Sequence, residues 1–130
     1  MQSLAPAFSV SRHENPREIH WSAAGLWKEE DFLALQKELA EKAKPFIEDG
    51  RGFNTLGDLT DFVVQTREMA EKMRKSQDAS AAAGVERMAL ICPSMLVRQQ
   101  FTRVSGSLNI AFFENRADAI AWLRSRETAC

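Results

Sequence analysis

The segment RMALIC, residues Arg87–Cys92, is the strongest indication of the fold class of this chain. Its apolar residues follow one another without interruption after Arg87. A strand with one wet face alternates apolar and polar residues, whereas a strand buried on both faces is a short continuous apolar run. Pro93 and Ser94 end the run. Strands buried on both faces occur in parallel sheets that helices cover on either side. The segment therefore predicts a layered α/β fold.

Near the amino terminus, two alternating runs predict an antiparallel hairpin. Residues 7–13 and residues 18–23 each place apolar side chains at every second position, which is the period of a strand. Between them, residues 14–17 read ENPR, a set of residues typical of a turn. The first strand is therefore expected to run antiparallel to the second.

After the hairpin, helix-like and strand-like patterns alternate along the chain. Helices are expected over residues 28–47, 61–76, 95–104 and from 115 onwards, and strands over residues 53–59, 87–92 and 108–113. Pro45 is expected to bend or break the last turn of the first helix. Residues 79–84 are expected either to continue the second helix or to form a loose connection, and Gly84 and Gly106 are expected to end the second and third helices. Such alternation implies crossover connections. The prediction is an α/β fold with a mixed, mostly parallel sheet of four to five strands, an amino-terminal antiparallel hairpin and about four helices.

Size and composition indicate one domain, residues 1–130 with a core at about 7–124. The chain has 130 residues, of which 45% are hydrophobic and 27% are charged, both near globular averages. Its 17 basic and 18 acidic residues give a net charge of −1 and no electrostatic reason to expect a nucleic acid as partner. Cys92 and Cys130 make a poor disulfide framework, which favours a cytoplasmic location. The sequence shows no signal peptide, and no apolar run long enough for a membrane span.

The stretch NIAFFENRADAIAWL, residues 109–123, resembles the closing motif of the STAS-like (SpoIIAA-like) family, relatives of the sporulation anti-sigma-factor antagonists. In that motif a strand is followed by a phenylalanine, a polar turn, and a helix that begins with an acid and ends in Trp-Leu. Here Phe113, residues 114–115 and residues 118–123 supply these parts. The order of elements extends the likeness over about Phe8 to Arg124. The resemblance implies a STAS-like fold and a non-enzymatic regulatory or protein-interaction domain.

The resemblance also draws attention to the segment DLTD, residues 58–61. In the phosphorylated antagonists of this superfamily, a serine at this strand-to-helix junction accepts phosphate from a partner kinase, in a motif such as Asp-Ser-Ser-Gly. Here neither Ser nor Gly follows the acid, and Thr60 is the residue that could take the acceptor role. The other interpretation is that Asp58 or Thr60 caps the next helix. The carboxylate of Asp61 would then interact favourably with the positive end of the helix dipole. Asp58 and Asp61 would repel a phosphate group on Thr60.

Polar side chains follow two neighbouring strands of the expected sheet, where ligands often bind in α/β folds. The candidate switch or interaction residues at this edge are Asp58, Thr60, Asp61, Ser94 and Arg98. They would form the working face of a domain whose partner is another protein.

Met69, Met73 and Met95, together with Met88, are candidates for the lining of an apolar pocket between helices and sheet. Methionine also fills irregular gaps in a core, which is the simpler interpretation. STAS-like domains resemble lipid-binding α/β folds of similar architecture. The alternative function is therefore the binding or sensing of a small apolar, lipid-like ligand.

No catalytic or metal-binding constellation stands out. His13 and His20 flank the hairpin turn and are expected to face one another, without an obvious third metal ligand. Cys92 is expected to be a buried, unreactive thiol. Because no nucleophile can be matched with a base, neither an enzyme nor a cofactor is predicted. A homodimer through exposed helix faces is an open alternative to a monomer.

Overall fold

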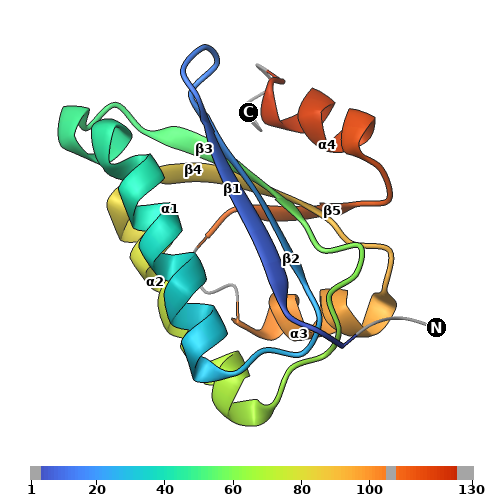
Figure 1. The fold of residues 1–130 in the computed structure, drawn as a ribbon. Coiled ribbons are helices and arrows are strands. Elements are labelled where there is room, and N and C mark those ends of the chain that lie inside the picture. Colours follow the sequence, from blue (N-terminus) through green and yellow to red (C-terminus); the bar gives the residue numbers. More distant parts are fainter. Residues whose placement is uncertain (1–3, 105–107, 126–130) are drawn as a thin grey trace.

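The computed structural model describes residues 4–104 and 108–125 of the chain, and the side chain of residue 104 is excluded from the description (Figure 1). Nine elements follow one another in it: β1 (Ala7–His13), β2 (Glu18–Ala24), α1 (Glu29–Asp49), β3 (Phe53–Asp58), α2 (Arg67–Ala83), β4 (Val85–Ile91), α3 (Met95–Val104), β5 (Ile110–Phe113) and α4 (Arg116–Leu123). The strands form one sheet in the order β1-β2-β3-β4-β5. β1 runs antiparallel to β2, and the other neighbouring pairs are parallel. The predicted fold class and the hairpin are confirmed.

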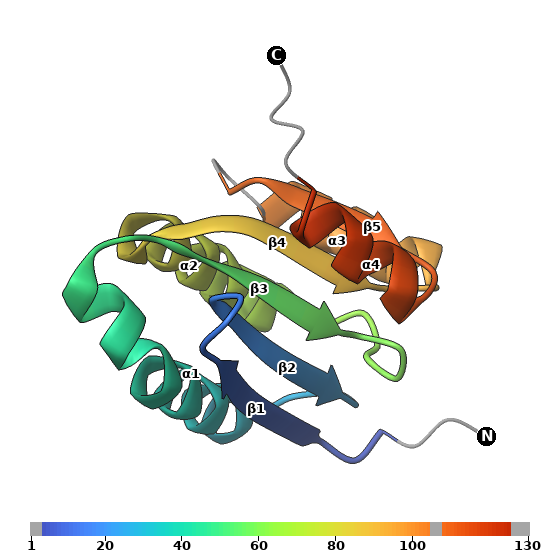
Figure 2. The same cartoon turned by 90° about the horizontal axis from the view of Figure 1, so that it is seen from above.

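Helices cover both faces of the sheet, as the continuous apolar run of β4 requires. Figure 1 and Figure 2 show α1, α2 and α3 on one face and α4 on the other. In β4, Met88 and Leu90 pack into the core below α1, α2 and α3, whereas Ala89 and Ile91 pack against α4. All four side chains are at most 5% exposed. The prediction of a strand shielded above and below is therefore confirmed.

Helix α2 begins at Arg67, so the expected start near Asp61 is wrong. Thr66 is the N-cap, and its Oγ1 accepts a hydrogen bond from the backbone N–H of Met69 at 3.2 Å. Phe62 has the spacing of a helical apolar stripe with Met69 and Met73, but it lies in an extended loop. There its ring packs 6.1 Å from the rings of Trp27 and Phe101. The ring is buried in the core, and this burial holds the loop in place. The spacing of the apolar residues in the sequence does not reveal it.

The carboxyl-terminal ends of α2 and α1 were open questions in the sequence. α2 runs on through the small-residue stretch to Ala83, which is the first of the two alternatives for residues 79–84, and Gly84 then stops it with a φ of 110°, as predicted. α1 continues through Pro45 to Asp49. The side chain of Phe46, next to that proline, is buried and packs its ring 5.4 Å from the ring of Phe53, which stabilises the last turn. The expected stop at Gly106 lies outside the described residues.

Candidate functional site

The segment Asp58–Asp61 forms a turn of its own at the carboxyl end of β3. The backbone N–H and the hydroxyl of Thr60 both donate to Oδ1 of Asp58, at 3.0 and 2.6 Å. Side-chain bonds from an aspartate to a backbone N–H two residues on are the hallmark of an Asx turn. The carbonyl of Asp61 accepts from the N–H of Gly25 at 3.0 Å, which ties the turn to the end of β2. The prediction that Asp58 or Thr60 caps α2 is wrong, because the N-cap is Thr66, and five residues lie between it and Thr60.

Ser94 and Arg98 lie at the start of α3, directly after β4. The hydroxyl of Ser94 accepts from the N–H of Val97 at 3.3 Å, so it serves the first turn of α3. The guanidinium of Arg98 donates to the carbonyl of Cys92 and lies 5.9 Å from the ring centroid of Phe112. Both side chains therefore hold the junction between β4 and α3.

The two groups of candidate interaction residues lie at one edge of the sheet, and the hollow described there is lined by the first group. Asp58 pairs with Ile91 in the register of β3 and β4, so the two turns leave the sheet at neighbouring positions. A surface hollow is lined by Asp58, Thr60 and Asp61 together with the ends of β1 and β2. Neither Ser94 nor Arg98 is among the residues that line it. The structure places these five side chains along an edge, not around a single cavity.

Two large apolar side chains are exposed beside that edge. Met95 is 63% and Leu96 is 66% exposed in the first turn of α3. The core side of this helix carries Val97 and Phe101, which are one turn apart. Met95 lies two positions before Val97, about 200° round the helix, and so points away from the core. Its predicted place in an apolar pocket is wrong.

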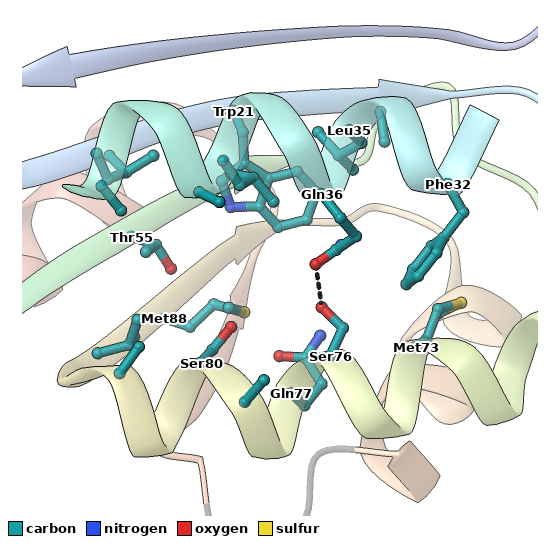
Figure 3. A pocket seen from close by; sticks show the side chains of 18 of the residues that line it. Trp21, Phe32, Leu35, Gln36, Thr55, Met73, Ser76, Gln77, Ser80 and Met88 are labelled. Carbon is teal, nitrogen blue, oxygen red and sulfur yellow. Dashed lines mark hydrogen bonds between the residues drawn. The ribbon is translucent and has the colours of Figure 1, made fainter. Parts of the chain in front are cut away.

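An apolar pocket of about 220 Å³ lies between α1, α2 and the sheet (Figure 3). Met69 and Met73 line it, and so does Met88. The other lining residues come from β2, α1, β3, α2, β4 and α3 and from two loops. They are Ile19, Trp21, Ala23, Trp27, Phe32, Leu35, Gln36, Leu39, Ala40, Ala43, Ile47, Phe53, Thr55, Phe62, Ser76, Gln77, Ala79, Ser80, Ala83, Val85 and Phe101. No Lys, Arg, His, Asp or Glu occurs among these described lining residues.

A few polar side chains point into this pocket from opposite sides. Gln36 of α1 and Ser76 of α2 face one another, and the hydroxyl of Ser76 donates to Oε1 of Gln36 at 3.0 Å (Figure 3). Thr55 on β3 and Gln77 on α2 are only 5% and 6% exposed. Within the described part of the chain, Thr55 Oγ1 and Gln77 Oε1 have no hydrogen-bond partner. These residues could not be recognised from the sequence, since polar residues on a helix or strand give no sign that they face a cavity.

A buried polar cluster that the sequence did not reveal lies on the face covered by α4. Glu18 on β2 is fully buried and accepts two bonds from Arg124, at 3.0 and 3.1 Å, and one from His20 Nε2 at 2.8 Å. Arg116 lies 2.9 Å from Nδ1 of His20. Because an arginine can only donate, Nδ1 accepts, and the Nε2–H of a neutral His20 donates to Glu18. We call Glu18, His20, Arg116 and Arg124 the Glu18 cluster. It fastens both ends of α4 to β2.

Burial and hydrogen bonding shift the pKa values within the Glu18 cluster. Burial alone would raise the pKa of Glu18, but the hydrogen bonds from Arg124 and His20 outweigh it and lower the pKa. Burial lowers the pKa of His20, and the bond to Glu18 offsets this only in part. Both shifts favour a carboxylate beside a neutral imidazole. The rings of His13 and His20 do face one another, as expected, with centroids 4.0 Å apart.

The other chemically reactive candidates are occupied or buried. The thiol of Cys92 is fully buried, and burial raises its pKa although Arg98 lowers it in part. A raised pKa keeps the thiol protonated and unreactive at neutral pH.

Within the described residues, no group of three His, Cys, Asp or Glu side chains could hold a metal ion. In the same residues, no helix is both long and apolar enough to cross a membrane.

Two solved structures share the fold of this chain. An uncharacterised DUF3478-family protein with a SpoIIAA-like fold, from Shewanella loihica PV-4, superposes with a TM-score of 0.69 at 21% identity, and the match covers 95% of this chain and 98% of that one. An anti-sigma factor antagonist from Mycobacterium paratuberculosis superposes with a TM-score of 0.59 at 11% identity, covering 93% of this chain and 96% of that one. No curated protein matches the sequence significantly.

The sequence matches a family model as well as these folds. The SpoIIAA-like model aligns with residues 19–124, from the second strand of the hairpin to the end of α4. This range includes the turn at Asp58–Asp61, α3, all strands except β1, and the closing motif at residues 109–123. The resemblance noted in the sequence is confirmed, and the chain belongs to the SpoIIAA-like family.

Proposed function

We propose that this protein is a non-enzymatic regulatory module that binds another protein through the edge of the sheet where β3 and β4 end. The observation that carries the proposal is the pair of exposed side chains Met95 and Leu96 in the first turn of α3. Exposed apolar side chains that gather next to polar residues are typical of sites where proteins meet. The Asp58–Asp61 turn and Arg98 would supply the polar rim of such a site.

A third apolar side chain extends this surface. Val64 is 44% exposed and precedes Gln65, whose backbone N–H and carbonyl are bonded to the side chain of Gln100 at 2.8 and 3.0 Å. Gln100 lies one turn after Leu96 on α3, and residues four apart share a helix face. Val64 therefore lies beside the face that presents Leu96. We call Val64, Met95 and Leu96 the α3 patch.

Two further observations support a regulatory role without catalysis. The fold is similar to that of a protein described as an anti-sigma factor antagonist, a class that acts on other proteins. The side chains that could act as nucleophiles near this edge are already occupied: Thr60 bonds to Asp58, Ser94 bonds to Val97, and Cys92 is buried. Ser94 and Cys92 bond to backbone groups, and the carboxylate of Asp58 is held by both the hydroxyl and the backbone N–H of Thr60.

Disruption of the α3 patch tests the proposal. The doubly substituted variant Met95→Glu/Leu96→Glu would be compared with Leu33→Glu, which changes an equally exposed leucine on α1. Each protein is expressed in its host and purified together with the proteins that bind it, which quantitative mass spectrometry then identifies. Each partner found in this way is purified and titrated with the native protein and the variants. We expect the double variant to lose at least ten times more affinity than Leu33→Glu. Equal affinities of the three proteins for that partner would contradict the proposal.

Thr60 is the proposed switch within this surface. Its hydroxyl donates to Asp58, so a phosphoryl group on Thr60 would break that bond and stand beside two carboxylates. The repulsion would open the turn next to the α3 patch. Detection of phosphate on Thr60 in protein from the host, and weaker partner binding by Thr60→Glu but not Thr60→Val, would support this role. Absence of the modification under all growth conditions would remove it.

A second function, the binding of a small apolar ligand, is favoured by the pocket between α1, α2 and the sheet. Its volume of about 220 Å³ exceeds the roughly 150 Å³ of an engineered cavity that binds benzene. Toluene, whose seven carbon atoms suit this volume, would be titrated into protein with ¹³C-labelled methionine methyl groups, and the NMR signals of Met69 and Met73 would report on occupancy. We expect Ser80→Phe, which directs a ring into the pocket, to abolish the shifts of these signals, and Ala82→Phe on the exposed side of α2 to preserve them. Equal shifts in both variants would contradict binding in this pocket.

A further inference from the structure

We infer that the pocket between α1, α2 and the sheet selects a small, uncharged apolar molecule that carries one hydroxyl group. The inference rests on the proposed ligand-binding function of this pocket and adds the chemical class of the ligand. Three properties of the lining residues support it: two buried polar atoms without partners, the lack of charge, and the limited volume.

The two unpartnered atoms are complementary to a hydroxyl. Thr55 Oγ1 and Gln77 Oε1 belong to side chains at least 94% buried, and within the described chain neither atom makes a hydrogen bond. Buried polar groups in native proteins are almost always paired, because an unpaired one destabilises the fold. Figure 3 shows both side chains directed into the pocket, one from β3 and the other from α2. A ligand hydroxyl can accept a bond from Thr55 and donate its own proton to Gln77.

The nearby polar pair does not meet this need. Ser76 and Gln36 are bonded to one another across the pocket, so the Ser76 hydroxyl is already used as a donor. This contact links α1 to α2, where the two helices face one another across the pocket (Figure 3). Thr55 and Gln77 remain the buried pair that a ligand could satisfy.

The absence of charge among the described lining residues decides against an anionic ligand. A carboxylate in an apolar pocket loses its hydration, and it is stabilised there only by a positive group or several hydrogen-bond donors. The lining contains no basic side chain. A fatty-acid anion would therefore bind less well than an alcohol of the same chain length.

The volume limits the length of the ligand. Each water molecule in the liquid occupies about 30 Å³, so a pocket of about 220 Å³ has room for about seven non-hydrogen atoms of that size. Hexan-1-ol, with seven such atoms, matches the pocket, whereas a diacyl lipid does not. The ligand class is a medium-chain or small aromatic alcohol.

Three molecules of equal chain length test the inference: hexan-1-ol, 1-chlorohexane and hexanoate at pH 8. Protein with ¹³C-labelled methionine methyl groups would be titrated with each by NMR. Met69, Met73 and Met88 line the pocket and should shift, whereas the exposed Met95 is an internal control that should not. We expect hexan-1-ol to bind about three- to tenfold more tightly than 1-chlorohexane, because its hydroxyl gains hydrogen bonds in the pocket. Hexanoate should bind more weakly than hexan-1-ol.

Substitutions identify the groups responsible. Thr55→Val removes the hydroxyl and keeps the shape of the side chain, and Gln77→Met does the same for the amide. Each should weaken hexan-1-ol binding about three- to tenfold and leave 1-chlorohexane binding within twofold. Gln99→Met, at an exposed position of α3 outside the pocket, should change neither affinity. If one variant fails to fold, the other variant and the comparison of the three molecules on the native protein still decide.

The outcomes separate this inference from the function on which it rests. Equal binding of hexan-1-ol and 1-chlorohexane, or tightest binding of hexanoate, would overturn the inference while leaving an apolar-ligand pocket in place. An unchanged affinity of both variants for hexan-1-ol would also overturn it. If none of the three molecules shifts Met69, Met73 or Met88 at millimolar concentration, the ligand-binding function fails as well.

Discussion

The indole ring of Trp21 lies so closely over Gly57 that a Cβ atom at position 57 would be 2.4 Å from Cζ2 of the ring. The two residues are register partners on the parallel strands β2 and β3. Trp21 also lines the pocket. Glycine at position 57 therefore allows the indole to lie across the neighbouring strand and form a wall of the pocket.

Gly57→Ala is expected to destabilise the protein by about 1–3 kcal/mol, the usual cost of overpacking a core. The new methyl group would also meet Leu90 at 2.8 Å, so it must push one of two side chains aside. Urea unfolding measures the loss, and titration with hexan-1-ol should show weaker binding as Trp21 moves into the pocket. The additional change Trp21→Phe should restore part of the stability, because a smaller ring leaves room for the methyl group. Unfolding midpoints equal to that of the native protein would show that the contact is not tight.

Thr66→Ala should lower the free energy of unfolding by about 1 kcal/mol, since it removes the N-cap of α2. The matched control is Thr60→Ala, because Thr60 bonds only within its own exposed turn and should cost less than about 0.5 kcal/mol. Chemical denaturation of both variants measures the difference. A larger loss for Thr60→Ala would place the helix start at the earlier residue.

Gln65→Leu should destabilise the protein by about 2–4 kcal/mol, because this buried side chain satisfies three backbone groups. Its Oε1 accepts from the N–H of Trp27 at 2.9 Å, and its Nε2 donates to the carbonyls of Gly25 and Val63 at 3.0 and 2.6 Å. Leucine would leave all three groups buried without a partner.

Gln99→Leu is the control for this prediction, since Gln99 is exposed on α3 and should change stability little. Calorimetry of both variants gives the comparison. A loss at position 65 no greater than that at position 99 would show that the network around Gln65 contributes nothing.

Stability should fall on acidification in two stages that report on the Glu18 cluster. The pKa of His20 is lowered from 6.5 in the folded state. The contribution of His20 to the free energy of unfolding is therefore present above pH 6.5 and is lost as the pH falls below that value. The pKa of Glu18 is lowered from 4.5, so its contribution is lost below pH 4.5. Urea unfolding between pH 2 and pH 8 measures both stages.

Glu18→Gln should remove the lower stage and cost about 2 kcal/mol at pH 7, because it weakens the charged hydrogen bonds with Arg124. His20→Phe should remove the upper stage. Glu14→Gln, in the exposed hairpin turn, should keep both. Identical pH profiles of Glu18→Gln and Glu14→Gln would contradict the assignment.

Cys92 should resist modification in the folded protein. A thiol that is fully buried and has a raised pKa presents little thiolate to a reagent. The variant Cys130→Ser leaves Cys92 as the remaining cysteine of the chain. Its reaction with dithionitrobenzoate at pH 7.5 should be at least a hundred times slower in buffer than in 6 M urea. Comparable rates would show that the carboxyl end of β4 is open to solvent.

The order of elements and the layered sheet could be predicted from the order of the residues. The uninterrupted run at Arg87–Cys92 specified burial on both faces, and the alternation at residues 7–13 and 18–23 specified the hairpin. Residues 109–123 carried the motif of the SpoIIAA-like family. Each of these signals lies within a few neighbouring residues, because the period of apolar side chains is set by the local backbone.

The contacts between side chains that are distant in the sequence could not be predicted and are seen in the folded structure. Phe62 has helical spacing but lies in a loop, because it packs between the rings of Trp27 and Phe101. Glu18 and Arg124 are bonded although 106 positions separate them. Thr55 and Gln77 come together in a pocket because the β3–α2 connection folds one element over the other. Contacts of this kind depend on how helices pack on the sheet, and that packing is fixed by the whole core, not by the pattern of any one segment.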